Sequence, residues 1–317
     1  MLKYSALLED KAGPLLVNGN GGSPIETVLH ELPALKDRLV EHGAILFRGF
    51  RVASANEFDA FVSRWSDNHL KYVYRSSPRS EVTEHVMTST TYPASVDIQL
   101  HNENSYHRQW PLTVAFCCIE PAAVGGETPI ASMRAVTAAI GEQLMEKFEQ
   151  RRVEYIRHYH EAVDLPWQSV FQTESREKVQ EYCSQYDMTC DWIDDKLLRT
   201  AGIAQGVTTH PKTREKVFFN QAHLFHVSSL GPIHAEALVT MYGVNRLPRH
   251  ARFGDGAEIP DLDLRRVSDA FKKSAITFRW QKGDVLVLDN MSYAHGRRPF
   301  KGSRKVLAAL MDPSATG

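Results

Sequence analysis

Candidate strands in this sequence fall into two groups that lie far apart along the chain. Runs of apolar and β-branched residues predict strands at 44–50, 96–100, 112–119, 276–280, 285–288 and 305–310. Helical spacing dominates three stretches between the groups, 134–150, 174–186 and 232–244. A β core with helices around it fits this order better than alternating strand–helix–strand units. We therefore predict a mainly β fold with flanking helices and a jelly-roll (double-stranded β-helix) core, as a single domain over residues 1–317 with a helical insert at about 134–275.

Composition excludes several classes of protein. The chain has 317 residues, 43% of them hydrophobic, so it can bury a full core. Lys plus Arg (37) and Asp plus Glu (38) balance, without the basic excess of nucleic-acid binders. Charges at residues 9–11 interrupt the apolar N-terminal run, which argues against a signal peptide and a membrane span. We expect a cytoplasmic protein that binds neither nucleic acid nor membrane, and the sequence leaves its oligomeric state open.

Two His-x-acid pairs are candidates for a metal site, because residues i and i+2 of a strand point to one face. They are His101-Asn102-Glu103 and His234-Ala235-Glu236. With 14 histidines and 38 acidic residues, roughly 1.7 such pairs are expected by chance. The count alone therefore proves nothing.

Local structure separates the two pairs. His234 lies in the predicted helix 232–244, where residues i and i+2 diverge by about 200°. His101 follows the predicted strand 96–100, from which its side chain and that of Glu103 leave on the same face. Only the pair His101 and Glu103 suits one metal ion.

A third ligand would complete the two-histidine, one-carboxylate set of iron(II) oxygenases. His295 follows the apolar strand 285–288, and nine residues later Arg304 begins another apolar strand. An arginine in such a place suits a bound carboxylate. The alternative, a strand-end histidine and a solvated arginine, stays open on spacing alone. His223 and His226 form a weaker candidate, with no acidic or cysteine partner nearby in the sequence.

Seven segments in order along nearly the whole chain carry the motifs of one family. They are ILFRGF (45–50), SPR (77–79), TSTTYPA (88–94), LHNENSYHRQWP (100–111), GGETPIA (125–131), FFNQAHLFH (218–226) and GDVLVLDNMSYAHGRRPFKGSRKV (283–306). In these segments the chain resembles the TauD/TfdA (clavaminate synthase-like) family of iron(II)- and 2-oxoglutarate-dependent dioxygenases, and within it the SyrP-like branch. The resemblance implies a clavaminate synthase-like jelly roll.

The resemblance also implies roles for individual residues. It makes His101, Glu103 and His295 the iron ligands. Thr128 and Arg304 become anchors for the distal carboxylate of 2-oxoglutarate, whereas by itself Thr128 reads as a threonine at the start of a strand.

The chain departs from the wider family at one position. Relatives carry a second arginine four residues after the first, where this chain has Ala308. How the 1-carboxylate of 2-oxoglutarate is held is thus open, with Arg297 and Arg298 as candidates.

The expected reaction follows from the ligand set. Halogenating relatives replace the carboxylate ligand with a small residue, so the presence of Glu103 favours oxygenation. We expect a hydroxylase that uses iron(II), 2-oxoglutarate and O2 on an amino acid or amino-acid-derived substrate, free or tethered to a peptidyl carrier protein, in antibiotic biosynthesis. Candidate substrate contacts are Arg79, Asn104, Asn220 and Gln221, and Arg79 also reads as a solvated loop residue. Alternatives are desaturation, epoxidation, cleavage of a sulfonate or phosphonate, and a catalytically silent binding protein.

Overall fold

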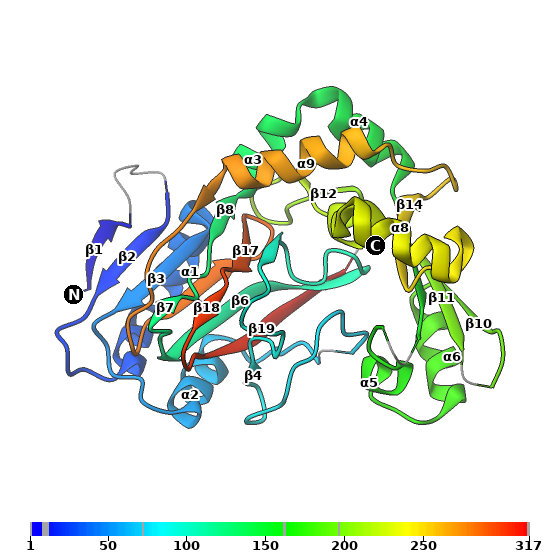
Figure 1. Cartoon of the computed structure of the whole chain (residues 1–317). Coiled ribbons are helices and arrows are strands. Elements are labelled where there is room, and N and C mark those ends of the chain that lie inside the picture. The colour runs from blue at the N-terminus through cyan, green and yellow to red at the C-terminus, as the bar shows by residue number, and fades with distance from the viewer. Residues whose placement is uncertain (1, 8–12, 72, 161–162, 196, 316–317) are drawn as a thin grey trace.

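Two β-sheets form the core of the molecule in the computed structural model, which describes residues 2–7, 13–71, 73–160, 163–195 and 197–315 (Figure 1). The larger sheet has the order β1-β2-β3-β16-β6-β19-β4. Its strands are β1 (Lys3–Ala6), β2 (Leu15–Asn18), β3 (Ala44–Arg48), β16 (Val285–Asp289), β6 (Gln109–Glu120), β19 (Lys305–Ala315) and β4 (Met87–Thr88). The smaller sheet has the order β15-β8-β17-β5. Its strands are β15 (Ala275–Ile276), β8 (Ile130–Ser132), β17 (Tyr293–Arg297) and β5 (Ile98–His101). A separate two-stranded sheet pairs β7 (Val124–Gly125) with β18 (Phe300–Lys301).

Alternation along the strands explains why the two sheets and the helices form layers. In β3, Ala44 and Leu46 belong to a core cluster that includes Ile130 of the smaller sheet. Ile45 and Phe47 point the other way, into a cluster with the helices. These helices are η1 (Ile25–Glu31), α1 (Leu32–His42) and α2 (Ala55–Trp65). The predicted mainly β fold with a jelly-roll core is confirmed.

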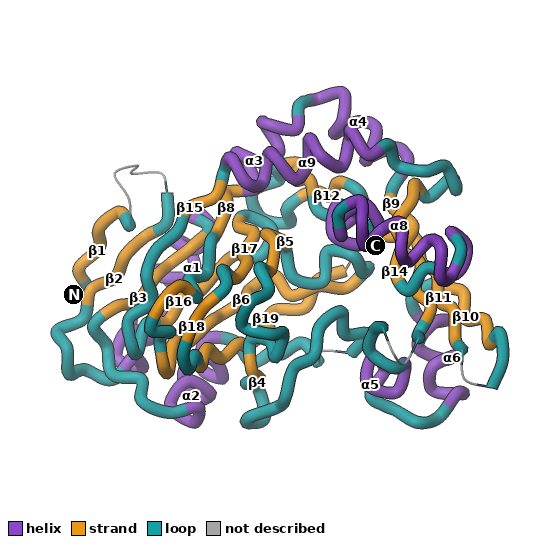
Figure 2. The backbone as a smooth tube through the Cα atoms, in the orientation of Figure 1, coloured by secondary structure: helices purple, strands orange, loops and turns teal. Residues whose placement is uncertain are grey.

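The insert between β8 and β15 contains more than helices. Its helices are α3 (Met133–Ile140), α4 (Glu142–Arg151), α5 (Trp167–Phe171), α6 (Arg176–Gln185), α7 (Ala222–Phe225), η2 (Val227–Leu230), α8 (Pro232–Tyr242), η3 (Val244–Arg246) and α9 (Asp261–Lys273). It also contains a sheet of order β10-β11-β9-β14 and a hairpin. These strands are β10 (Met188–Trp192), β11 (Leu198–Ala204), β9 (Val153–His158), β14 (Arg249–Phe253), β12 (Val207–Thr209) and β13 (Lys216–Phe218). Figure 2 shows this sheet beside α8, away from the two core sheets.

The sheet of the insert was not predicted, because its central strand lacks a polar face. In β9 both Tyr155 and the neighbouring Ile156 are buried, and so are the polar Arg157 and His158. A strand covered on both sides shows no apolar–polar alternation, which was the signal sought.

The structure changes two predicted elements and adds a strand that was not predicted. The helix expected at 134–150 is divided by Gly141, whose φ of 82° is left-handed. The strand expected at 276–280 pairs only at Ala275 and Ile276, and beyond them Phe278 and Trp280 are buried in the core without strand pairing. β17 was not predicted as a strand because its sequence, Tyr-Ala-His-Gly-Arg, is neither an apolar run nor an alternation of apolar and polar residues, although all five residues are buried.

None of the helices in the described ranges is long and apolar enough to cross a lipid bilayer.

Candidate metal centre

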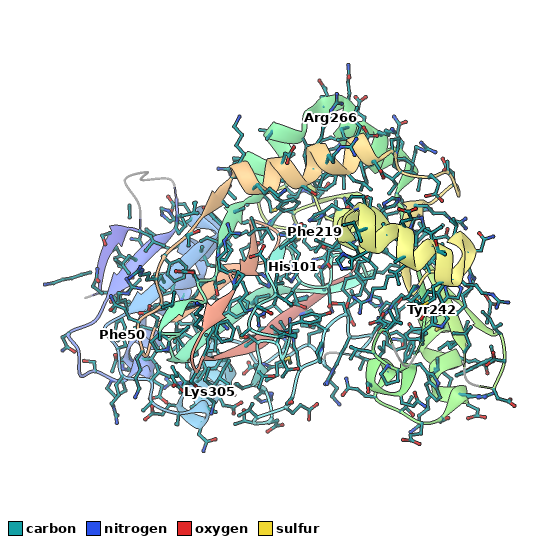
Figure 3. The ribbon with its side chains drawn as sticks, viewed as in Figure 1. Phe50, His101, Phe219, Tyr242, Arg266 and Lys305 are labelled. Atoms are coloured by element: carbon teal, nitrogen blue, oxygen red, sulfur yellow. The ribbon has the colours of Figure 1, made fainter. Side chains whose placement is uncertain are left out.

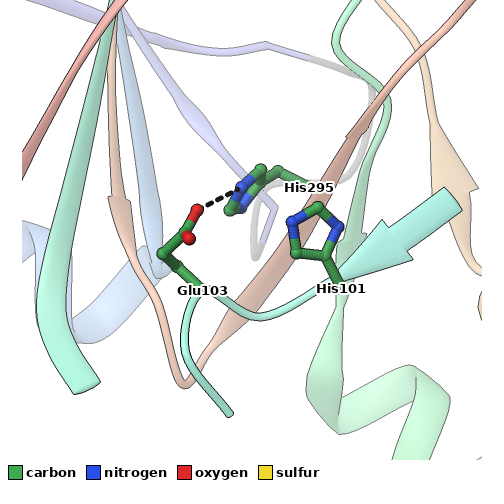
Figure 4. Close-up of side chains that lie close together, drawn as sticks. All are labelled: His101, Glu103 and His295. Carbon is green, nitrogen blue, oxygen red and sulfur yellow. Dashed lines mark ion pairs between the residues drawn. The ribbon is translucent and has the colours of Figure 1, made fainter. Parts of the chain in front are cut away.

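His101, Glu103 and His295 come together at the end of β5 (Figure 4). Figure 3 shows where His101 lies in the whole molecule, between the core sheets and the insert. β17 pairs antiparallel with β5, and this register sets His295 opposite His101. One ligand atom from each of the three side chains lies within 4.8 Å of the other two. Nε2 of His295 is 3.6 Å from Oε2 of Glu103. The three side chains predicted to share a metal ion are therefore neighbours in the structure.

The tautomer and charge of His101 suit a metal ligand. Nδ1 of His101 lies 2.8 Å from the carbonyl oxygen of Gln99. The carbonyl can only accept, so Nδ1 carries the hydrogen and Nε2 keeps a lone pair, as is usual for histidines that bind metals. Burial, assisted by the nearby His295, lowers the pKa of His101 to about 4. The ring is neutral at neutral pH, which is the form that coordinates a metal.

Asn290 fixes the backbone of Glu103 from a distant part of the chain. Its Oδ1 accepts a hydrogen bond from the backbone N–H of Glu103 at 2.7 Å, and its Nδ2 donates to the carbonyl of Glu103 at 3.0 Å. The Asn102 side chain donates in turn to the Asn290 carbonyl at 2.6 Å. Asn290 follows β16, so the turn after one strand positions the carboxylate that follows another. No local pattern in the sequence points to Asn290, since it lies 187 positions from Glu103.

Arg79 holds the carboxylate of Glu103. Its Nη2 donates to Oε2 of Glu103 at 2.6 Å, and the two side chains are only 5% and 2% exposed. Burial by itself raises the pKa of Glu103, but Arg79 and the two histidines outweigh it and bring the pKa well below its usual range. Glu103 is therefore ionised. Arg79, predicted as a substrate contact, lines the ligand cavity, but its guanidinium binds the candidate ligand Glu103.

We expect Arg79→Gln to weaken iron(II) binding about 10- to 100-fold, as is typical when a residue that orients a metal ligand is lost. Glutamine keeps a donor but removes the charge that holds Glu103 ionised and in place. Anaerobic titration of iron(II) against a competing chelator measures the change. Arg79→Lys keeps the charge but loses the planar fork, so its affinity for iron(II) should lie between those of Arg79→Gln and the parent protein. Unchanged affinity in folded Arg79→Gln would contradict this role.

Thr128 and Arg304 meet in the same cavity as the three candidate metal ligands. Nη2 of Arg304 lies 3.5 Å from Oγ1 of Thr128, which also accepts a hydrogen bond from Trp280 Nε1 at 3.0 Å. Nε of Arg304 donates to the carbonyl of Gly126 at 2.9 Å. Burial, with a contribution from Arg297, lowers the pKa of Arg304 to about 10. The guanidinium is charged at neutral pH, and no carboxylate of the described residues pairs with it, so this end of the cavity suits an anion.

The two arginines considered for the second carboxylate of 2-oxoglutarate are engaged elsewhere. Arg297 donates to the carbonyls of Tyr92, Pro93 and Val96 at 2.7–3.0 Å, and so fixes the loop before β5. Arg298 is exposed and lies 3.4 Å from Asp97. Arg297 lines the cavity and Arg298 does not.

The cavity has a volume of about 430 Å³ and is shared by the core sheets and the insert. Its wall includes His101, Glu103, His295, Thr128 and Arg304 from the core side and Asp164, Gln221, Arg249, Leu230 and Leu238 from the insert. Such a volume is typical of small-molecule sites. Gln221, predicted as a substrate contact, is on the wall and donates to the carbonyl of Asn102 at 2.7 Å.

Asn104 and Asn220, the other predicted substrate contacts, do not line this cavity. Asn104 has a left-handed φ of 56°, and its Oδ1 accepts from the Tyr106 hydroxyl. Asn220 is fully buried, where it donates to the carbonyl of Gly206 and accepts from the N–H of Ala222. Their side chains instead stabilise turns, a frequent role of asparagine.

The other candidate histidines lie in different surroundings. His234 is exposed on α8, as the helical spacing predicts. His223 is buried, with its ring stacked on Phe271. His226 does have partners, His250 and Glu258, which form a second group of close ligand atoms. Glu258 is 59% exposed and its carboxylate oxygen lies 2.9 Å from Nε2 of His250, so a hydrogen bond accounts for this group.

Comparisons with known proteins identify the family of this chain and several relatives. Residues 15–311 match a family described as "Taurine catabolism dioxygenase TauD, TfdA family". The chain is 40% identical over 275 residues to the dapdiamide synthesis protein DdaC of Enterobacter agglomerans, covering 87% of this chain and 84% of that protein. It is 30% identical over 298 residues to a clavaminate synthase-like protein of Arabidopsis thaliana, covering 90% of this chain and 86% of that one.

A solved structure shares the fold. PvcB of Pseudomonas aeruginosa, described as an Fe, alpha-ketoglutarate dependent oxygenase from an isonitrile synthetic pathway, superposes with a TM-score of 0.55 and 16% identity. The superposition covers 98% of this chain and 91% of PvcB.

Proposed function

The chain belongs to the TauD, TfdA family of dioxygenases, and we propose that it uses iron(II), 2-oxoglutarate and O2 to hydroxylate a C–H bond of an amino acid or amino-acid-derived substrate. The observation that carries this proposal is one cavity wall that holds both His101, Glu103 and His295 and the cationic Arg304. Two histidines and one carboxylate on one face leave further positions of the metal free for the cosubstrates.

Each residue has a role in this proposal. His101, Glu103 and His295 hold the iron, and Arg79 keeps the carboxylate of Glu103 ionised and oriented. Arg304 and Thr128 bind the distal carboxylate of 2-oxoglutarate. When bound, the metal and 2-oxoglutarate supply the oxidising power for C–H cleavage, while the protein positions the substrate and excludes water. The apolar walls of the cavity serve that exclusion.

Two observations favour hydroxylation in a biosynthetic setting. Glu103 keeps the carboxylate ligand that halogenating relatives lack. The relative from Enterobacter agglomerans takes part, by its name, in dapdiamide synthesis, and the similarity to it extends over most of both chains. We therefore propose a role in the biosynthesis of a natural product.

The proposal is tested with purified protein, iron(II) and 2-oxoglutarate. We expect one iron per chain under anaerobic conditions, and succinate release after O2 is admitted with a panel of free amino acids. A responding amino acid should gain one oxygen atom by mass spectrometry, whereas desaturation would remove two hydrogens. A folded protein that binds no stoichiometric iron and forms no succinate would refute the proposal and favour a binding protein.

A further inference from the structure

A cluster of buried charges lies where the insert forms the cavity wall. β14 pairs antiparallel with β9 so that Arg249 is directly opposite Arg157. Asp164 lies between their guanidinium groups. Its Oδ2 is 3.3 Å from Nη2 of Arg157 and 2.6 Å from Nε of Arg249, and its Oδ1 is 2.5 Å from Nη2 of Arg249. One carboxylate is thus shared by two arginines.

This cluster carries a net positive charge. Burial alone raises the pKa of Asp164, but Arg157 and Arg249 outweigh it and hold the pKa well below its usual range. Asp164 is therefore ionised, and both guanidinium groups are protonated. Among the residues that the structure describes, Asp164 is the only carboxylate paired with either arginine. Two positive charges and one negative charge leave one positive charge without a carboxylate partner in the described part of the chain.

The unbalanced charge is accessible from the cavity through Arg249. Arg157 is 0% exposed, packs between the rings of Tyr74 and Tyr159, and also donates to the carbonyl of Arg75. The side chain of Arg249 is 24% exposed and lines the cavity. Its Nε and Nη2 bind Asp164 and the carbonyl of Ser76. Its Nη1 makes no hydrogen bond within the described ranges, so its two N–H groups remain available to a ligand.

We propose that Arg249 binds a carboxylate of the substrate. This inference rests on the proposed function and narrows its substrate to a molecule with a free carboxylate. The other cavity cations have different partners: Arg79 binds Glu103, Arg297 binds backbone carbonyls, and Arg304 lies beside Thr128. Leu230 and Leu238 line the same cavity as Arg249 and suit the apolar part of a small amino-acid-like molecule. A guanidinium fixed by Asp164 is already oriented, which lowers the entropy cost of binding.

The geometry also explains why the substitution that tests this site should leave the fold intact. Without Arg249, Asp164 keeps its contact with the buried Arg157, so one positive charge still balances one negative charge. Arg252→Gln is a matched control. Arg252 is on the same strand and pairs with Glu154, but it does not line the cavity.

The experiment uses the anaerobic complex with iron(II) and 2-oxoglutarate, together with common L-amino acids and their primary amides. Ligand binding is measured as a shift in melting temperature, and succinate release is measured separately in O2. We expect at least one free acid to bind and its amide to bind roughly tenfold or more weakly, because hydrogen bonds to charged groups contribute most strongly. Arg249→Gln should weaken binding of that acid by roughly 10- to 100-fold, Arg249→Lys should weaken it less, and Arg252→Gln should leave it unchanged.

Three outcomes would overturn the inference: amides that bind as tightly as acids, no free acid that binds, or unchanged acid binding in Arg249→Gln. Iron stoichiometry and 2-oxoglutarate affinity are measured on the same samples. If they are normal while the acids fail to bind, the inference about Arg249 is wrong and the proposed dioxygenase stands. If iron or 2-oxoglutarate does not bind to the parent protein, the proposed function itself fails.

Discussion

Replacing His295 with alanine is expected to abolish iron binding and turnover. His295 is one of three side chains whose ligand atoms converge, and it is buried, so water cannot restore the lost contact at low cost. Loss of residues that merely orient a metal ligand costs 10- to 100-fold in affinity, and loss of a ligand should therefore cost more than about 100-fold. In the parent protein, iron(II) and 2-oxoglutarate together should give a weak visible charge-transfer band under anaerobic conditions. His295→Ala should lack that band.

His234→Ala is the matched control, because His234 also belongs to a His-x-Glu pair but is exposed on α8. It should bind iron and turn over like the parent. A persistent band with turnover in folded His295→Ala would exclude His295 as a ligand. Loss of stoichiometric iron in His234→Ala would contradict the assignment of the site to the strand pair.

Arg304→Gln is expected to weaken the binding of 2-oxoglutarate roughly 30- to 3,000-fold. Truncating one member of a buried charged pair costs about 2–5 kcal/mol of binding free energy, and each 1.4 kcal/mol is a factor of ten in affinity. The guanidinium is largely buried beside Thr128, where a bound carboxylate has few water contacts. Iron should stay bound, because Arg304 does not contact the three candidate ligands in the described structure. Titration of 2-oxoglutarate against the iron-loaded variant measures the effect.

Two further variants sharpen this test. Arg304→Lys should not restore full affinity, because a lysine lacks the planar fork that matches a carboxylate. Arg298→Gln, which removes an exposed arginine outside the cavity, should leave 2-oxoglutarate binding unchanged. An affinity of Arg304→Gln within about threefold of the parent would move the anchor to another residue, and Arg297 would be the first to examine.

The correct predictions about single strands and helices came from the local spacing of apolar and polar residues. His101 and Glu103 could be paired from the sequence because side chains two apart at a strand leave on one face, whatever the rest of the fold does. The same reasoning placed His234 on a helix, and in the structure His234 lies on α8. It failed for β9 and β17, whose residues are buried on both faces and show no alternation.

The sequence by itself therefore determined the β core, the family and the local His101–Glu103 pair, because these depend on spacing between neighbours and on motifs. Only the tertiary structure decided which distant groups meet. Strand pairing brings His295 to His101, and a loop brings Arg79 to Glu103. The insert brings Arg249, Arg157 and Asp164 together at the cavity. Partners of buried charges are chosen by the packing of segments far apart in the chain, and no local period encodes that choice.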